Sequence, residues 1–155
     1  MAKHAQSNNL AVTQITTKLG QLSALLGDLS PVMQEIAGIL ERDVTEAFDN
    51  ERNPTTHAKW ADLDEKTIKQ RTKAGKWPGK MLQVKGELVG SLTSDYGAKF
   101  ARVGVGTDYA PAMQFGRPDK NIPARAYLPW DGLHPETAAA VLEFLDGELA
   151  KTIFS

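Results

Sequence analysis

Three histidines are the residues best suited to bind a metal ion, but their spacing does not favour it. His4, His57 and His134 lie far apart, and none falls in an H-x-x-x-H or H-E-x-x-H arrangement, which would place two ligands on one helix face. The chain has no cysteine, so thiolate ligands and disulfides are excluded. We therefore predict no metal site.

Two glycine-containing stretches could bind phosphate, and neither completes its motif. GKWPGKM, residues 75–81, approaches the phosphate loop G-x-x-x-x-G-K-[ST], but Ala74 stands where the first glycine belongs and Met81 replaces the magnesium-binding hydroxyl. GVGTDY, residues 104–109, begins like a dinucleotide fingerprint, but Tyr109 occupies the place of the third glycine. We expect no nucleotide cofactor.

Residues for covalent and acid–base catalysis are also poorly placed. Ser91 in VGSLT lies outside the G-x-S-x-G frame that presents a catalytic serine. Glu41 and Asp43 fall on a helix that we expect to be solvated, a poor setting for acid–base catalysis. The sequence therefore predicts a protein that is not an enzyme and that carries no cofactor.

Charge is segregated along the chain although the net charge is only −1. Residues 28–51 carry seven acids against Arg42 alone, whereas residues 66–85 carry seven basic residues and no acid. The basic strip consists of Lys66, Lys69, Arg71, Lys73, Lys76, Lys80 and Lys85. It is interpreted as a solvated face, as a phosphate-facing surface, or as the complement of an acidic surface on another subunit. Trp77 lies within it, which keeps a nucleic-acid-binding module among the alternatives.

The composition predicts one soluble intracellular domain. A chain of 155 residues is long enough to bury a core without disulfides. The N-terminal MAKHAQSNN has no apolar run, so it is not expected to be a signal peptide. No stretch approaches the roughly 20 apolar residues of a membrane span.

Two amphipathic helices are predicted in the N-terminal third. Val12, Ile15, Leu19, Leu22 and Leu26 recur at spacings of three and four and predict a helix over residues 8–26. Gly27 then suits a left-handed helix end, and Ser30 with Pro31 predicts the start of a second helix that ends near residue 52. We interpret the pair as a helical hairpin spanning residues 8–52, after a flexible terminus at residues 1–8.

The remainder predicts a mixed region over residues 53–130 and a C-terminal helix over 134–154, which makes the fold class α+β in a single domain, with a small antiparallel sheet. A short helix should begin near Asp64, and a β-hairpin should span residues 91–106 with Val103 and Val105 on the core face. The predicted core anchors are Phe48, Trp60, Leu88, Tyr109 and Phe115.

Five patches in fixed order resemble the bacteriophage virion morphogenesis family, whose members include tail completion proteins of P2-like phages and the G protein of Mu-like phages. The patches are LSALLGDLSPVMQEIAGILERDV, FDNERNPTTHAKWADLDEKTIKQR, MLQVKGELVGSL, VGVGTDYAPAMQFG and IPARAYL. Together they cover roughly residues 22–128. Met113 departs from the pattern, because the family often has a histidine there.

The resemblance implies a late structural protein of the phage neck or upper tail that completes the tail and enables head–tail joining. It implies a six-fold ring of identical subunits, with the tail tube and head–tail connector proteins as partners. In such a ring the basic strip is interpreted either as meeting the acidic helix of the next subunit or as making non-specific contact with passing DNA. The lack of a long apolar run predicts no contact with a membrane. The implied location is the virion, after assembly in the host cytoplasm. A capsid assembly factor is the alternative.

Residues 109–130 are the predicted contact segment, with Arg117, Lys120, Arg125, Tyr127 and Trp130 as its candidate interface residues. Pro123 and Pro129 cannot donate ladder hydrogen bonds, which favours an edge strand or a stiff extended arm. Such an arm could add to a neighbouring subunit with Arg125 as its charged anchor. The alternative is a strand that packs within its own domain.

Overall fold

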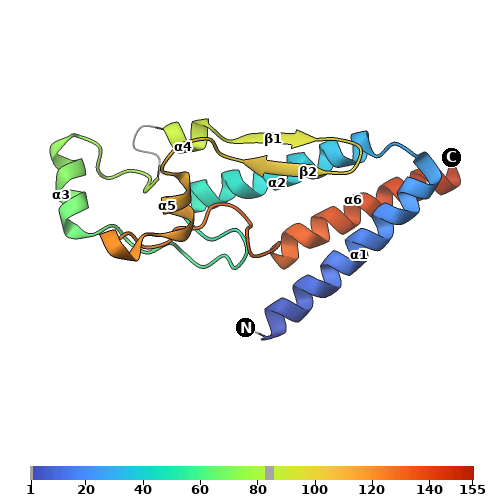
Figure 1. The fold of residues 1–155 in the computed structure, drawn as a ribbon, viewed down its shortest axis with the longest axis horizontal. Coiled ribbons are helices and arrows are strands. Elements are labelled where there is room, and N and C mark those ends of the chain that lie inside the picture. The colour runs from blue at the N-terminus through green and yellow to red at the C-terminus, as the bar shows by residue number, and fades with distance from the viewer. Residues whose placement is uncertain (1, 83–85) are drawn as a thin grey trace. The chain divides into compact units, whose positions relative to one another are not determined.

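The computed structural model describes residues 2–82 and 86–155, with side chains from residue 10 onward within those ranges. The elements are α1 (Ala2–Leu26), α2 (Ser30–Asn50), α3 (Glu65–Lys73), α4 (Glu87–Gly90), β1 (Thr93–Tyr96), β2 (Ala101–Gly104), α5 (Ala110–Phe115), a 3-10 turn (Pro118–Lys120) and α6 (Pro135–Phe154) (Figure 1). The predicted α+β class is confirmed. In the described residues no helix is both long and apolar enough to cross a bilayer.

The chain forms two compact units, each assembled from separate stretches of sequence. The first unit comprises Met1–Arg42, Ser94–Val103 and Asp131–Ser155, and the second comprises Asp43–Thr93 and Gly104–Trp130. That these units act together as the single domain expected from the sequence stays a prediction.

The first unit has its core between α1, the first half of α2, and α6. Leu22, Val32, Val141 and Leu145 are buried there, and α1 and α6 lie side by side (Figure 1). The spacing of three and four that predicted α1 therefore includes a real packing face, and α6 packs against it.

The prediction for α1 needs correction at the start of the helix and in its apolar stripe. The helix begins at Ala2 rather than near residue 8, so the backbone of residues 2–8 belongs to it. Val12 and Leu26, which we assigned to the apolar stripe, are 58% and 45% exposed. The buried part of the stripe is therefore confined to Ile15, Leu19 and Leu22 between them.

The junction between α1 and α2 follows the sequence closely. Gly27 has φ of 76°, the left-handed conformation that glycine adopts without strain. The carboxylate of Asp28 accepts hydrogen bonds from the Ser30 N–H at 2.9 Å and the Ser30 hydroxyl at 2.7 Å. These bonds lower the pKa of Asp28. The side chain of Asp28, rather than that of Ser30, thus supplies the hydrogen-bond acceptor for the backbone N–H at the start of α2.

The predicted β-hairpin is present as the two antiparallel strands β1 and β2. Its turn closes with the Gly97 N–H donating to the Phe100 carbonyl at 2.9 Å. Arg102 lies over the Phe100 ring at 5.0 Å and pairs with Asp95 at 2.7 Å. Val103 is half-buried, as is Val105, which lies beyond the end of β2, so the two valines only partly meet their expected place in the core.

An aromatic cluster of Phe48, Trp60 and Tyr127 forms the core of the second unit. The Phe48 ring stacks on Tyr127 with 5.1 Å between centroids and meets Trp60 edge-on at 6.0 Å. Phe48, Trp60 and Leu88, three of the predicted anchors, are buried. The α3 helix follows, where the Asp64 carboxylate accepts the Thr67 N–H at 2.7 Å.

The expectation that Tyr109 and Phe115 are core residues is wrong for this chain, because they are 40% and 53% exposed. The reason is α5, a helix that the sequence analysis did not predict. Its buried side carries Ala110 and Gln114, four residues apart, which turns Tyr109 and Phe115 away from the core.

Candidate functional site

The 109–130 segment is held by side chains rather than by a sheet. Gln114 is 5% exposed, and its Oε1 accepts the N–H groups of Tyr127 and Leu128, each at 3.0 Å. Its Nε2 donates to the Leu128 carbonyl at 3.2 Å. The predicted edge strand is therefore absent, since one amide side chain supplies the hydrogen bonds that a neighbouring strand would supply.

Gly116 is required where the chain turns after α5. Its φ is 75°, and a Cβ on this residue would lie 2.7 Å from the Ala124 nitrogen and 2.8 Å from the Ile122 oxygen. Any larger residue would therefore displace backbone. This close approach allows the short bridge between Arg117 and Ile122 that closes the loop containing the 3-10 turn.

Arg125 is buried within the second unit instead of extending outward as an anchor. It is 7% exposed, and its guanidinium donates from Nε to the Ala61 carbonyl and from Nη2 to the Asp62 carbonyl, both at 2.9 Å. Burial, and to a smaller degree the neighbouring charge of Arg71, lowers the pKa of Arg125. Arg125 therefore packs within its own chain, as in the alternative prediction for this segment.

Tyr127 is likewise an internal residue. It is 1% exposed, and its hydroxyl donates to the Ala110 carbonyl at 2.7 Å. Burial, with a smaller effect of Tyr109, raises the pKa of Tyr127 to about 12. A buried tyrosine with an internal partner does not offer its ring or its hydroxyl to another subunit.

Ionisation of Tyr127 should destabilise the fold at high pH. Because its folded pKa is raised from 10.0 to about 12, its stabilising effect is complete below pH 10 and is lost as the pH rises through 12. Ultraviolet difference titration of the parent against Tyr127→Phe should show one tyrosine that ionises near pH 12. The same tyrosine ionising at pH 10 in the folded chain would contradict the buried environment.

The remaining candidate contact residues are exposed. Arg117 pairs with Asp119 at 2.7 Å, and Lys120 faces solvent on the same turn. Trp130 is 68% exposed and meets the Phe115 ring edge-on at 5.2 Å between centroids. The exposed contact surface of this segment is therefore an aromatic pair beside a charged turn.

A cavity of about 790 Å³ opens in the second unit. The residues that line it include the apolar Leu63, Leu88 and Met113 and the basic Arg71 and Arg125. Arg71 donates to the carbonyls of Lys80 at 3.1 Å and Met81 at 2.5 Å, and burial lowers its pKa. Sequence reasoning did not find this cavity, because its wall combines α3, α4, α5 and the loop after the 3-10 turn.

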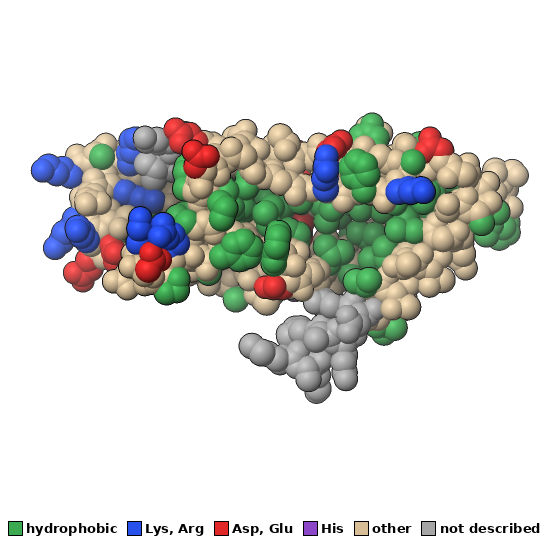
Figure 2. Space-filling model, viewed as in Figure 1, with side chains coloured by type: hydrophobic (Ala, Val, Ile, Leu, Met, Phe, Trp, Pro, Cys, Tyr) green, Lys and Arg blue, Asp and Glu red, His purple; other side chains and the backbone are tan. Residues whose placement is uncertain are grey.

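The basic strip divides into solvated and structural members. Figure 2 shows Lys and Arg side chains grouped around α3, with Asp and Glu side chains among them. Lys66, Lys69, Lys73 and Lys76 are exposed, whereas Arg71 is half-buried and Lys80 donates to the Asp49 carbonyl. Lys85 lies outside the described residues. The strip is therefore less uniform than its sequence indicates.

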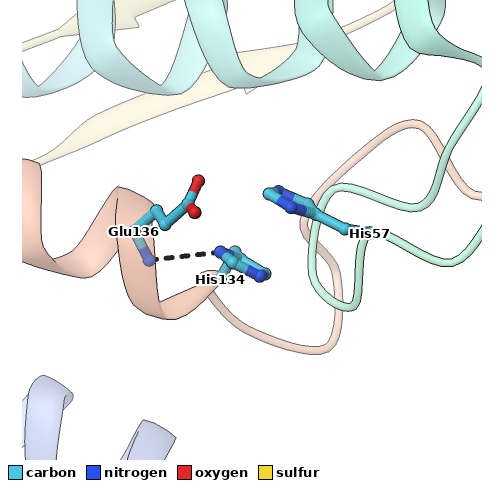
Figure 3. A group of neighbouring side chains, drawn as sticks. All are labelled: His57, His134 and Glu136. Carbon is cyan, nitrogen blue, oxygen red and sulfur yellow. Dashed lines mark hydrogen bonds between the residues drawn. The ribbon is translucent and has the colours of Figure 1, made fainter.

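His134 has a structural task at the start of α6. Its Nδ1 accepts the Glu136 N–H at 3.1 Å and so caps the helix before Pro135 (Figure 3). The Nδ1 position must be deprotonated to accept this bond. His57 belongs to the second unit and has φ of 61° in a loop, and the side chain of His4 lies outside the described ones.

Comparison with known proteins agrees with the resemblance found in the sequence. Residues 10–150 match the phage virion morphogenesis family, which covers both units. The chain belongs to this family. No solved structure matches the chain.

Two relatives are the proteins called G of phage Mu and of a Mu-like prophage. The chain is 34% identical over 139 residues to the Mu-like prophage FluMu G protein 1 of Haemophilus influenzae, covering 88% of this chain and 90% of that protein. It is 29% identical over 126 residues to the putative capsid assembly protein G of Escherichia phage Mu, covering 77% of this chain and 80% of that protein. The present chain is thus a structural protein of phage morphogenesis.

Gln114 is the residue of this region that sequence reasoning missed. Gln114 lies in VGVGTDYAPAMQFG, one of the five patches that resemble the family, and this was the signal in the sequence that could have pointed to it. A glutamine beside a proline-rich stretch otherwise reads as a solvated side chain, because glutamine is mostly exposed in folded proteins.

Proposed function

We propose that this protein completes or terminates the phage tail and enables the head to join it, acting in the neck or upper tail as a six-fold ring. The observation that carries the proposal is membership of the virion morphogenesis family across residues 10–150. The exposed Phe115–Trp130 pair adds support, since large exposed aromatic groups favour contact with another protein surface. The tail tube and the connector proteins are the proposed partners.

A second candidate function is capsid assembly. It is favoured by the name of the relative from phage Mu, a putative capsid assembly protein. In that role the protein would act while heads are built and would be dispensable for the last step of tail construction. The two functions predict different particles in infected cells.

Electron microscopy of lysates from phage that lack this protein separates the two functions. Loss of a tail completion protein should leave full heads beside separate tails, some of irregular length. Complementation with the parent chain should restore joined particles. Absent or malformed heads would contradict tail completion and favour capsid assembly.

The exposed lysines of α3 and the following loop have two proposed uses. In a ring they would face either the acidic residues of α2 on the next subunit or the DNA that passes through the channel. Glu35, Glu46 and Asp49 are exposed on α2 and offer the opposite charge. Because salt screens both contacts, a duplex-binding measurement on assembled rings, rather than salt dependence, distinguishes them.

A further inference from the structure

The Trp130 side chain is presented rigidly at the surface. The Gln114 amide fixes the backbone at Tyr127 and Leu128, Pro129 restricts the next residue, and the Trp130 N–H donates to the Leu128 carbonyl at 2.8 Å. The ring itself is 68% exposed. A preorganised tryptophan loses little conformational entropy on binding, which favours a role as an interface anchor.

Trp130 cannot occupy the cavity of its own chain. Tyr109 and Met113, four residues apart, line the cavity from one side of α5, and Ala110 with Gln114 forms the buried side. Helical geometry then turns Phe115 away from the cavity, and Trp130 packs on Phe115. The cavity and the exposed tryptophan are therefore two separate surfaces of the second unit.

The cavity has the chemistry to receive an aromatic ring that is followed by an acid. Arg71 and Arg125 donate to backbone carbonyls. Glu51 acts electrostatically on both arginines, and Asp62 and Asp64 act on Arg125. Among the described residues, however, none of these carboxylates forms a salt bridge with either guanidinium. Guanidinium groups bind aromatic faces and carboxylates. Leu63 and Leu88 supply apolar wall. Three acids also line it, Asp62, Asp64 and Glu87, and all are exposed on the rim, with Asp64 already capping α3.

The chain itself contains the matching segment. The exposed Asp131 directly follows Trp130, so an entering tryptophan brings a carboxylate toward the guanidinium groups. We propose that Trp130 of one copy inserts into the Arg71–Arg125 cavity of a second copy, with Asp131 facing the arginines. The contact is heterologous, because each copy offers a different surface to each neighbour, and such contacts either close into rings or extend as filaments. This inference deepens the proposed ring and rests on it.

Sedimentation of the purified full chain tests the contact. The parent should associate with rising concentration, and its tryptophan emission should shift to the blue as the Trp130 ring loses contact with water. Trp130→Phe should lack this shift, because Trp60 and Trp77 emit in both chains. Trp130→Ala should weaken association by about 30-fold or more, as for the loss of an interface hot spot. Tyr96→Ala is the matched control, because Tyr96 is 41% exposed on the hairpin, and it should associate like the parent.

The cavity side is tested with Met113→Glu, which puts a carboxylate of the same chain beside the arginines, and with the rim variant Lys120→Glu if the first unfolds. Val89→Glu is the control, since Val89 is half-buried in α4 but does not line the cavity. In a mixture of the two variants, the Trp130→Ala chain keeps an intact cavity and the Met113→Glu chain keeps an intact Trp130. The mixture should therefore form pairs but no larger assemblies.

Several outcomes would overturn the contact. They are a parent that stays monomeric with unchanged tryptophan emission, a Trp130→Ala variant that associates like the parent, and a mixture that forms either full-sized assemblies or none. If the Trp130 contact were overturned, the proposed function would still be tested separately by electron microscopy of lysates, because that experiment does not depend on Trp130. Unjoined heads and tails from phage carrying Trp130→Ala would connect the Trp130 contact with the proposed role in head–tail joining.

Discussion

Phe48→Ala should lower the free energy of unfolding by about 3–5 kcal/mol, the usual cost of removing a buried phenylalanine. The ring is 1% exposed and lies between Trp60 and Tyr127, so its loss removes both aromatic contacts at once. Chemical denaturation of the parent and the variant measures the difference.

Phe100→Ala provides the control for this prediction. Phe100 is 43% exposed on the hairpin and contacts Arg102, so its removal should change stability only slightly. Equal losses for the two variants would mean that the aromatic cluster of Phe48 is not the core of the second unit.

Arg125→Ala should lower the free energy of unfolding by about 3 kcal/mol, because two hydrogen bonds from a charged donor are lost and the Ala61 and Asp62 carbonyls lose their partner. For a chain of this size that corresponds to a fall of roughly 6–12 °C in melting temperature. The measurement is thermal unfolding of the isolated monomer, monitored by circular dichroism.

Two variants sharpen the test of Arg125. Arg125→Lys keeps the charge but not the planar fork that reaches both carbonyls, so its melting temperature should lie between those of the parent and Arg125→Ala. Arg117→Ala removes an exposed arginine paired only with Asp119 among the described residues and should melt like the parent. If Arg125→Ala melted like the parent as a monomer and failed only in assembly, Arg125 would be an interface anchor after all.

The sequence by itself determined the long helices and the hairpin of this protein. Spacing of three and four predicted α1, Ser30 with Pro31 predicted the start of α2, and Gly27 predicted the left-handed end of α1. The C-terminal helix and the hairpin around Val103 were predicted as well. These features depend on neighbours within a few residues, so the chain encodes them locally. Five ordered patches also led to the family, because their order is itself information in the sequence.

Only the tertiary structure decided which face each residue of the 109–130 segment presents. Arg125 and Trp130 are five positions apart and looked equally suited to an interface, yet one is 7% exposed and the other 68%. The difference arises from partners distant in the sequence: the carbonyls at 61 and 62 capture Arg125, and the Gln114 amide sets the path that leaves Trp130 outside. Burial of a polar side chain depends on whether the fold supplies its hydrogen-bond partners, and those partners cannot be read from the residues beside it.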